Sequence, residues 1–107
     1  MHSYLGAAAA CLVLAASASA QDAGDARRGL TYVRNNCASC HAVERDVLSS
    51  PQPGVASFSA IAGTPGMTGI ALSVWLQSTH RDMPNFIIAP DDRSDIIAYI
   101  VSLRAKP

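Results

Sequence analysis

Apolar side chains recur three or four positions apart in several stretches of this sequence, which is the spacing that places them on one face of a helix. The clearest stretch is the last, where Ile96, Tyr99, Ile100 and Leu103 share a face. No stretch alternates apolar and polar residues as a half-buried strand does. The pattern therefore predicts an all-α fold, with helical segments at residues 24–36, 58–62, 69–77 and 90–104.

Residues that start helices stand at the expected places. Asp22 or Asp25 can cap or charge the start of the first helix, and Thr68 is suited to cap the third. Pro90 stands at the first position of the last helix, where its missing N–H costs nothing. Turn residues fill the stretches between helices and predict two long loops, at residues 42–56 and 78–90.

Gly29 lies inside the first predicted helix, although glycine there costs about 1 kcal/mol relative to alanine. A glycine in such a place commonly allows another helix to approach closely, and a merely tolerated surface glycine is the alternative.

The N-terminal part of the sequence resembles a targeting segment. An apolar, alanine-rich run from Leu5 to Ala16 precedes Ala18-Ser19-Ala20, a small-residue cleavage pattern. We expect residues 1–20 to be a secretory signal peptide and residues 21–107 to form one domain. The first ten residues contain no Lys or Arg, so an uncleaved N-terminal anchor is the alternative.

The charges balance, with eight Lys and Arg against eight Asp and Glu. This composition implies neither nucleic acid nor an anionic membrane surface as a partner. A chain of this length also has a marginal core, so a large apolar cofactor would supply buried surface that the side chains alone do not.

One motif carries specific chemistry: Cys37-Ala38-Ser39-Cys40-His41. Two cysteines three positions apart, followed directly by histidine, form the pentapeptide that attaches c-type haem. The two thiols add to the two vinyl groups, and the imidazole binds the iron. Export agrees with this interpretation, because thioether formation would protect both thiols in an oxidising compartment.

Three other interpretations of the cysteine pair are weaker. A thioredoxin-like redox pair requires alternating strands and helices, which the pattern does not predict. A zinc site needs a second pair of ligands, and Cys11, His2 and His80 give no such spacing. A disulfide between Cys37 and Cys40 would close a loop too small to restrict the unfolded chain much.

Taken together, residues 24–104 resemble a small class I cytochrome c. The resemblance rests on the haem motif, on Gly24-Asp25 with Gly29 in the first helix, on Leu72-x-x-Trp75-Leu76, on Met83-Pro84, and on Asp95-Ile96-Ile97-Ala98-Tyr99-Ile100 in the last helix. In that family the first and last helices cross with glycine against aromatic, so we expect Gly29 to lie against Tyr99.

The resemblance implies an all-α class I cytochrome c fold, with about four helices wrapped around one haem bound covalently through Cys37 and Cys40. It implies His41 and Met83 as the axial iron ligands. Met67 and His80 are the competing distal candidates, of which Met67 is explained by apolar packing and His80 by an exposed polar turn.

The implied function is that of a soluble, periplasmic one-electron carrier and not of an enzyme, because two axial side chains leave no open position on the iron. Redox proteins would dock transiently at the haem edge, and we expect a monomer with neither a small-molecule substrate nor a nucleic-acid partner. The alternatives are a haem subunit of a membrane oxidoreductase and a ligand-sensing module with a labile methionine.

Two departures from the family pattern matter. Val33 occupies the position four residues after the helix glycine that usually carries an aromatic, which predicts a less tightly packed crossing. Lys106 is the only lysine, so the lysine-rich ring of mitochondrial members is absent and gives no basis for assigning their partners.

Overall fold

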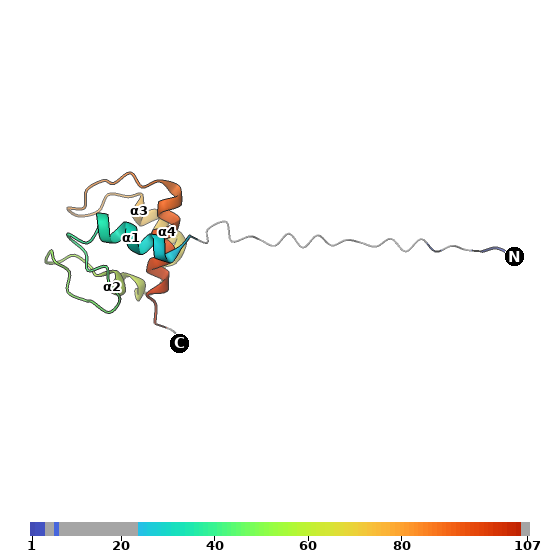
Figure 1. Ribbon diagram of the computed structural model, residues 1–107, viewed down its shortest axis with the longest axis horizontal. Coiled ribbons are helices and arrows are strands. Elements are labelled where there is room, and N and C mark those ends of the chain that lie inside the picture. Colours follow the sequence, from blue (N-terminus) through green and yellow to red (C-terminus); the bar gives the residue numbers. More distant parts are fainter. Residues whose placement is uncertain (4–5, 7–23, 106–107) are drawn as a thin grey trace.

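The computed structural model describes residues 1–3, 6 and 24–105, and within this part of the chain the regular elements are all helices. They are α1 (Ala26–Asn36), α2 (Phe58–Ala62), α3 (Gly69–Leu76) and α4 (Pro90–Ser102). The predicted all-α fold and its four helical segments are confirmed, with ends within two residues of those expected. Figure 1 shows the two long loops projecting on the same side of α4.

Side-chain caps explain why three of the helices begin where they do. The carboxylate of Asp25 accepts the N–H groups of Arg27 and Arg28 at the start of α1. Ser57 and Thr68 cap α2 and α3 in the same way. The last helix has no side-chain cap and begins instead with proline, followed by Asp91 and Asp92 in its first turn.

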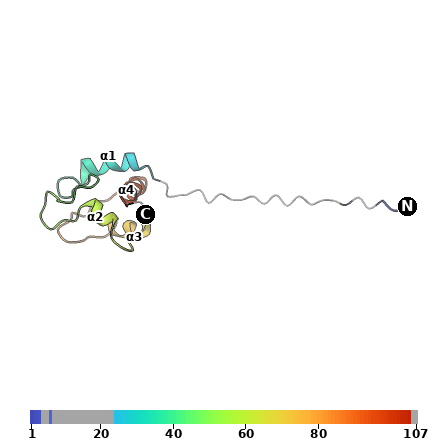
Figure 2. The same cartoon turned by 90° about the horizontal axis from the view of Figure 1, so that it is seen from below.

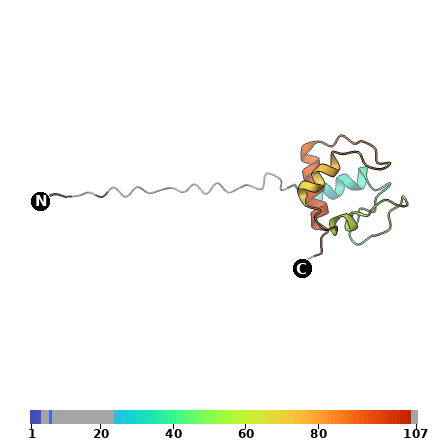
Figure 3. The same cartoon turned by 180° about the vertical axis from the view of Figure 1, so that it is seen from behind.

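The last helix is the centre of the fold, because α1, α2 and α3 all pack against it. Figure 2 looks almost along its axis, with α1 on one side and α3 on the other, and Figure 3 shows α3 from behind. The core is formed by buried side chains from all four helices and from the segments that connect them: Val33, Val43, Phe58, Ala62, Leu72, Ile88, Ile96, Tyr99, Ile100 and Leu103.

Gly29 lies where α1 crosses α4, against Tyr99 as predicted. A Cβ atom on Gly29 would lie 2.9 Å from the Cβ of Tyr99 and would overlap the carbonyl of Asp95. Gly24 makes a second close approach, since a Cβ there would lie 2.5 Å from the backbone nitrogen of Asp95. The crossing is therefore tight despite Val33, which is fully buried, and the looser packing predicted from that residue is not found.

Asp95 joins these two helices through polar contacts. Its carboxylate accepts the backbone N–H of Asp25 at 2.7 Å and the Nε–H of Arg28 at 3.0 Å. The hydrogen bond from Arg28, together with that from the backbone of Asp25, lowers the pKa of Asp95. Asp95 is only 7% exposed, so the carboxylate holds the start of α1 in place from within the helix interface.

The segment expected to be a signal peptide, residues 1–20, lies almost entirely outside the described residues. Within the part of the chain that is described, none of the helices combines the length and apolar character needed to cross a bilayer.

Candidate functional site

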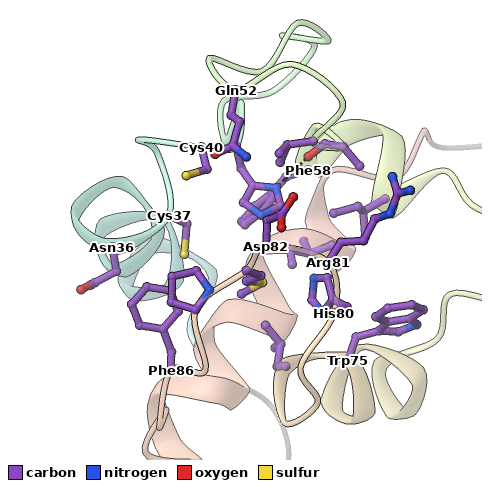
Figure 4. A pocket seen from close by; sticks show the side chains of 18 of the residues that line it. Asn36, Cys37, Cys40, Gln52, Phe58, Trp75, His80, Arg81, Asp82 and Phe86 are labelled. Carbon is purple, nitrogen blue, oxygen red and sulfur yellow. Dashed lines mark hydrogen bonds between the residues drawn. The ribbon is translucent and has the colours of Figure 1, made fainter.

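The cysteine–histidine motif begins where α1 ends. Cys37 is the C-cap of α1, and its own carbonyl accepts the N–H groups of Cys40 at 3.2 Å and His41 at 2.9 Å. These two bonds wind the motif into one further turn, so that all three side chains line one cavity. Figure 4 shows Cys37 and Cys40 on one side of this cavity, with His80 and Trp75 on the other.

Cys37 and Cys40 are not joined by a disulfide. Burial raises the pKa of the Cys37 thiol to about 11, with a smaller contribution from Cys40. Cys37 is therefore protonated at neutral pH, and a thiol of this kind is a poor nucleophile towards disulfides. This observation argues against a thioredoxin-like redox pair.

The imidazole of His41 is oriented by a backbone carbonyl. Its Nδ1 lies 2.7 Å from the carbonyl oxygen of Ala56. Because a carbonyl oxygen can only accept, Nδ1 carries the hydrogen and Nε2 retains its lone pair. The ring also contacts Phe58, with centroids 5.1 Å apart. The carbonyl that orients the ring therefore comes from Ala56, in the long loop after His41.

That loop is fixed by bonds between residues well separated in the chain. The N–H of Ala42 donates to the Oγ of Ser50 at 3.0 Å, and the N–H of Gln52 donates to the carbonyl of Cys40 at 3.3 Å. The N–H of Phe58 donates to the carbonyl of Ala42 at 2.9 Å. These bonds hold the two ends of the loop side by side and place Ala56 next to His41.

The cavity has a volume of about 500 Å³, within the range of cofactor sites. Every candidate site residue from the sequence lines it: Cys37, Cys40, His41 and Met83, together with the competing Met67 and His80. Most of the remaining wall is apolar, from Tyr32, Phe58, Ile61, Leu72, Trp75, Leu76, Phe86, Ile88 and Ile100.

These residues fit a c-type haem. The cavity brings together two thiols, an imidazole with its Nε2 lone pair available, a thioether and apolar walls, and each of these groups has a partner in haem chemistry. Among the described residues that line it, only Arg81 and Asp82 are charged. A large apolar cofactor would bury most of its surface here.

Met83 lies in a tight turn of the loop before α4. Its N–H donates to the carbonyl of His80 at 3.1 Å, and Asp82 directly before it has a positive φ of 44°. Few residues other than glycine adopt such a φ without strain, although aspartate tolerates it better than most. The turn therefore positions the backbone of Met83 at the cavity wall.

The structure agrees with the expectation for Met67 and differs from that for His80. Met67 packs against the core cluster, and its carbonyl accepts a hydrogen bond from Arg104, which agrees with a packing role. His80 was expected in an exposed polar turn. Its neighbours Arg81 and Asp82 are exposed, but His80 is half-buried with its ring edge-on to Trp75, 5.1 Å between centroids.

Two supporting residues were not predicted from the sequence. Ser50 fixes the loop that carries Ala56, yet in the sequence it is one of several turn-forming residues. Trp75 stood out only as part of the pattern Leu72-x-x-Trp75-Leu76, and nothing local indicated that its ring would meet His80 across the loop.

Comparison with known proteins agrees with this geometry. The family model described as Cytochrome c matches residues 26–104. The chain is also similar to the protein named Cytochrome c-552 from Bradyrhizobium diazoefficiens, with 36% identity over 106 residues, which is 97% of this chain and 99% of that protein. No solved structure gave a significant match.

Proposed function

The chain belongs to the cytochrome c family of haem-based electron carriers, and we propose that it is a soluble one-electron carrier with His41 and Met83 as its iron ligands. Its c-type haem is covalently bound, and we assign the attachment to Cys37 and Cys40. The haem supplies an iron that changes between Fe(II) and Fe(III) by one electron.

The observation that carries this proposal is the hydrogen bond between His41 and Ala56. It fixes the tautomer in which Nε2 is free to bind a metal, and it orients the ring through a bond that does not depend on the metal. Phe58 limits rotation of the same ring. The orientation of the His41 ring is therefore set by protein contacts and does not require the iron.

Met83 is the distal ligand that the chemistry favours. A thioether binds iron without losing a proton, and as a soft donor it favours Fe(II). Both Met67 and Met83 line the cavity, but Met67 also packs against the core, whereas Met83 is outside that cluster. With both axial positions filled by side chains, no position remains for a substrate, so we propose no enzymatic activity.

Partner docking is assigned to apolar side chains at the cavity. Trp75 is 48% exposed and Phe86 is 41% exposed, and both also line the cavity. The sequence contains no Asp, Glu, Lys or Arg from Val47 to Thr79. Among the described lining residues the charges are Arg81 and Asp82, which are of opposite sign, so electron-transfer rates should fall only mildly as salt is raised. A steep fall would show that charged groups steer the encounter.

We further propose that the mature protein is exported to the periplasm as a monomer. This rests on the apolar run before Ala18-Ser19-Ala20 and on the haem motif. An N-terminal mass that begins after Ala20 would support it, and a retained N-terminus would favour a tethered subunit of a membrane oxidoreductase.

A ligand-sensing module is the second candidate, because among the described residues the loop that carries Met83 makes only local hydrogen bonds. Carbon monoxide separates the two functions: a carrier in its reduced form should bind it slowly or not at all. Fast binding by the wild-type protein would favour the sensor.

Covalent attachment is tested by intact mass after extraction with acidified acetone. The wild-type chain should retain the mass of one haem, because two thioethers survive the extraction. Cys37→Ser and Cys40→Ser variants should each retain the haem through the remaining thioether, and the double variant should release it. Release of the wild-type colour into the organic phase would refute the proposal.

A further inference from the structure

Two side chains that can bind iron lie in a single turn of the cavity wall. His80 and Met83 are three positions apart, both line the cavity, and the N–H of Met83 donates to the carbonyl of His80 at 3.1 Å. A side chain that replaced the thioether of Met83 would therefore not need to come from another part of the fold.

The imidazole of His80 is in a state suited to binding a metal. Its Nδ1 lies 3.4 Å from the carbonyl oxygen of Ser78, a weak contact that favours hydrogen on Nδ1 and leaves the lone pair on Nε2. His41 shows the same arrangement with Ala56. The edge-on contact with Trp75 keeps the ring of His80 at the cavity.

The loop that carries both residues lacks hydrogen bonds to distant parts of the described chain, and Ile88 is its one residue in the buried core. In the part of the chain that is described, every hydrogen bond made by residues 78–89 goes to a residue no more than four positions away. The strained backbone of Asp82, directly before Met83, adds a reason for the turn to relax when it is released.

We propose that His80 is a second distal ligand, which binds the iron when Met83 does not. The inference rests on the proposed function, since it requires a haem in this cavity with Met83 as its first distal ligand. Imidazole suits Fe(III) better than a soft thioether does. Exchange of the ligand would therefore lower the reduction potential and keep the iron closed to external ligands.

The test compares variants of the purified holoprotein by absorption and electron paramagnetic resonance spectra of the ferric form, and by carbon monoxide binding to the ferrous form. Met83→Ala should lose the iron–thioether charge-transfer band, remain low-spin with two nitrogen ligands, and bind carbon monoxide slowly. The double variant Met83→Ala/His80→Ala should become high-spin and bind carbon monoxide at least tenfold faster. Added imidazole should restore its low-spin spectrum.

Two controls make the assignment specific. His80→Ala alone should keep the wild-type band, and Met83→Ala/Met67→Ala should remain low-spin, because Met67 also lines the cavity. A Met83→Ala variant that is already high-spin, or a Met83→Ala/His80→Ala variant that stays low-spin, would overturn the role of His80 and leave the proposed function standing. Retention of the thioether band in Met83→Ala would instead refute Met83 as ligand and this inference with it.

Discussion

The two loops that meet at the cavity are held in different ways. The loop after His41, residues 42–56, is bonded to other elements along its length. The Tyr99 hydroxyl donates to the carbonyl of Val43, and Arg45 donates to the carbonyl of Ser102, so that α4 holds the loop from one side. Glu44 also pairs with Arg34 of α1.

The loop around Met83, residues 78–89, has no comparable ties among the described residues. Its hydrogen bonds stay within the loop or reach only the adjoining turns of α3 and α4. Ile88 is its one residue in the buried core, and Ile87 beside it is 97% exposed. Local stability follows the number of such contacts, so this loop should open more readily than the first.

The difference assigns separate tasks to the two sides. On the His41 side, hydrogen bonds within the protein set the orientation of the imidazole ring without any contribution from iron. These are the bond to Ala56 and the bonds that position Ala56. On the Met83 side, the bond to iron itself would supply much of what holds the loop. In the proposed carrier, a fixed proximal ligand and an exchangeable distal ligand would therefore share one cavity.

The largest effect should come from the helix crossing that supports the His41 side. Gly29→Val should lower the free energy of unfolding of the holoprotein by about 3 kcal/mol, because the new side chain would overlap the backbone of α4. Denaturant titration measures this. Thr31→Val, on the exposed face of α1, is the matched control. A loss below about 0.5 kcal/mol for Gly29→Val, typical of surface positions, would mean that the crossing is not close.

Two serine-to-alanine variants, one in each loop, compare how much the hydrogen bonds of the two loops contribute to stability. Ser50→Ala removes the acceptor for the N–H of Ala42, a buried residue, and should cost about 1–2 kcal/mol. Ser78→Ala removes an exposed bond to the carbonyl of Val74 and should cost under about 0.5 kcal/mol. Equal losses in the two variants would contradict the difference between the loops.

A smaller effect than that of Gly29→Val or Ser50→Ala should be the pH dependence carried by Asp95 at the start of α1. Its pKa is lowered in the folded protein, so its contribution is fully present above about pH 4 and is lost as the carboxylate is protonated at lower pH. Asp95→Asn should therefore destabilise by at most about 1 kcal/mol at pH 7. The gap from wild type should narrow towards pH 3; a constant gap would show that the charge of Asp95 is not involved.

Much of the fold was predictable because its signals are local. Thr68 and Pro90 mark helix starts through their own chemistry, and the structure begins α3 and α4 at those points. The haem motif is equally local, since the turn that brings together Cys37, Cys40 and His41 is made by their own backbone.

The features that the sequence did not predict depend on contacts between distant segments. Ala56 acts through its backbone carbonyl, a group that every residue has, so no side chain identifies it. From the sequence alone, Asp95 is typical of a surface charge on a helix. Its role depends on Gly24 and Gly29, which allow α1 to lie close to it. The half-buried position of His80 depends in the same way on the ring of Trp75.

The central claim, a haem held between His41 and Met83, is tested most directly by nuclear magnetic resonance of the reduced wild-type holoprotein with labelled methionine methyl groups. A methyl group bound above the face of a porphyrin lies in its ring current and is shifted far upfield. After the proposed cleavage the methionines that remain are Met67 and Met83. Only Met83 should show this shift, and a Met67→Ala sample should keep the shifted signal. A shifted signal that disappears in Met67→Ala, or a spectrum in which no methionine methyl is shifted, would contradict the account.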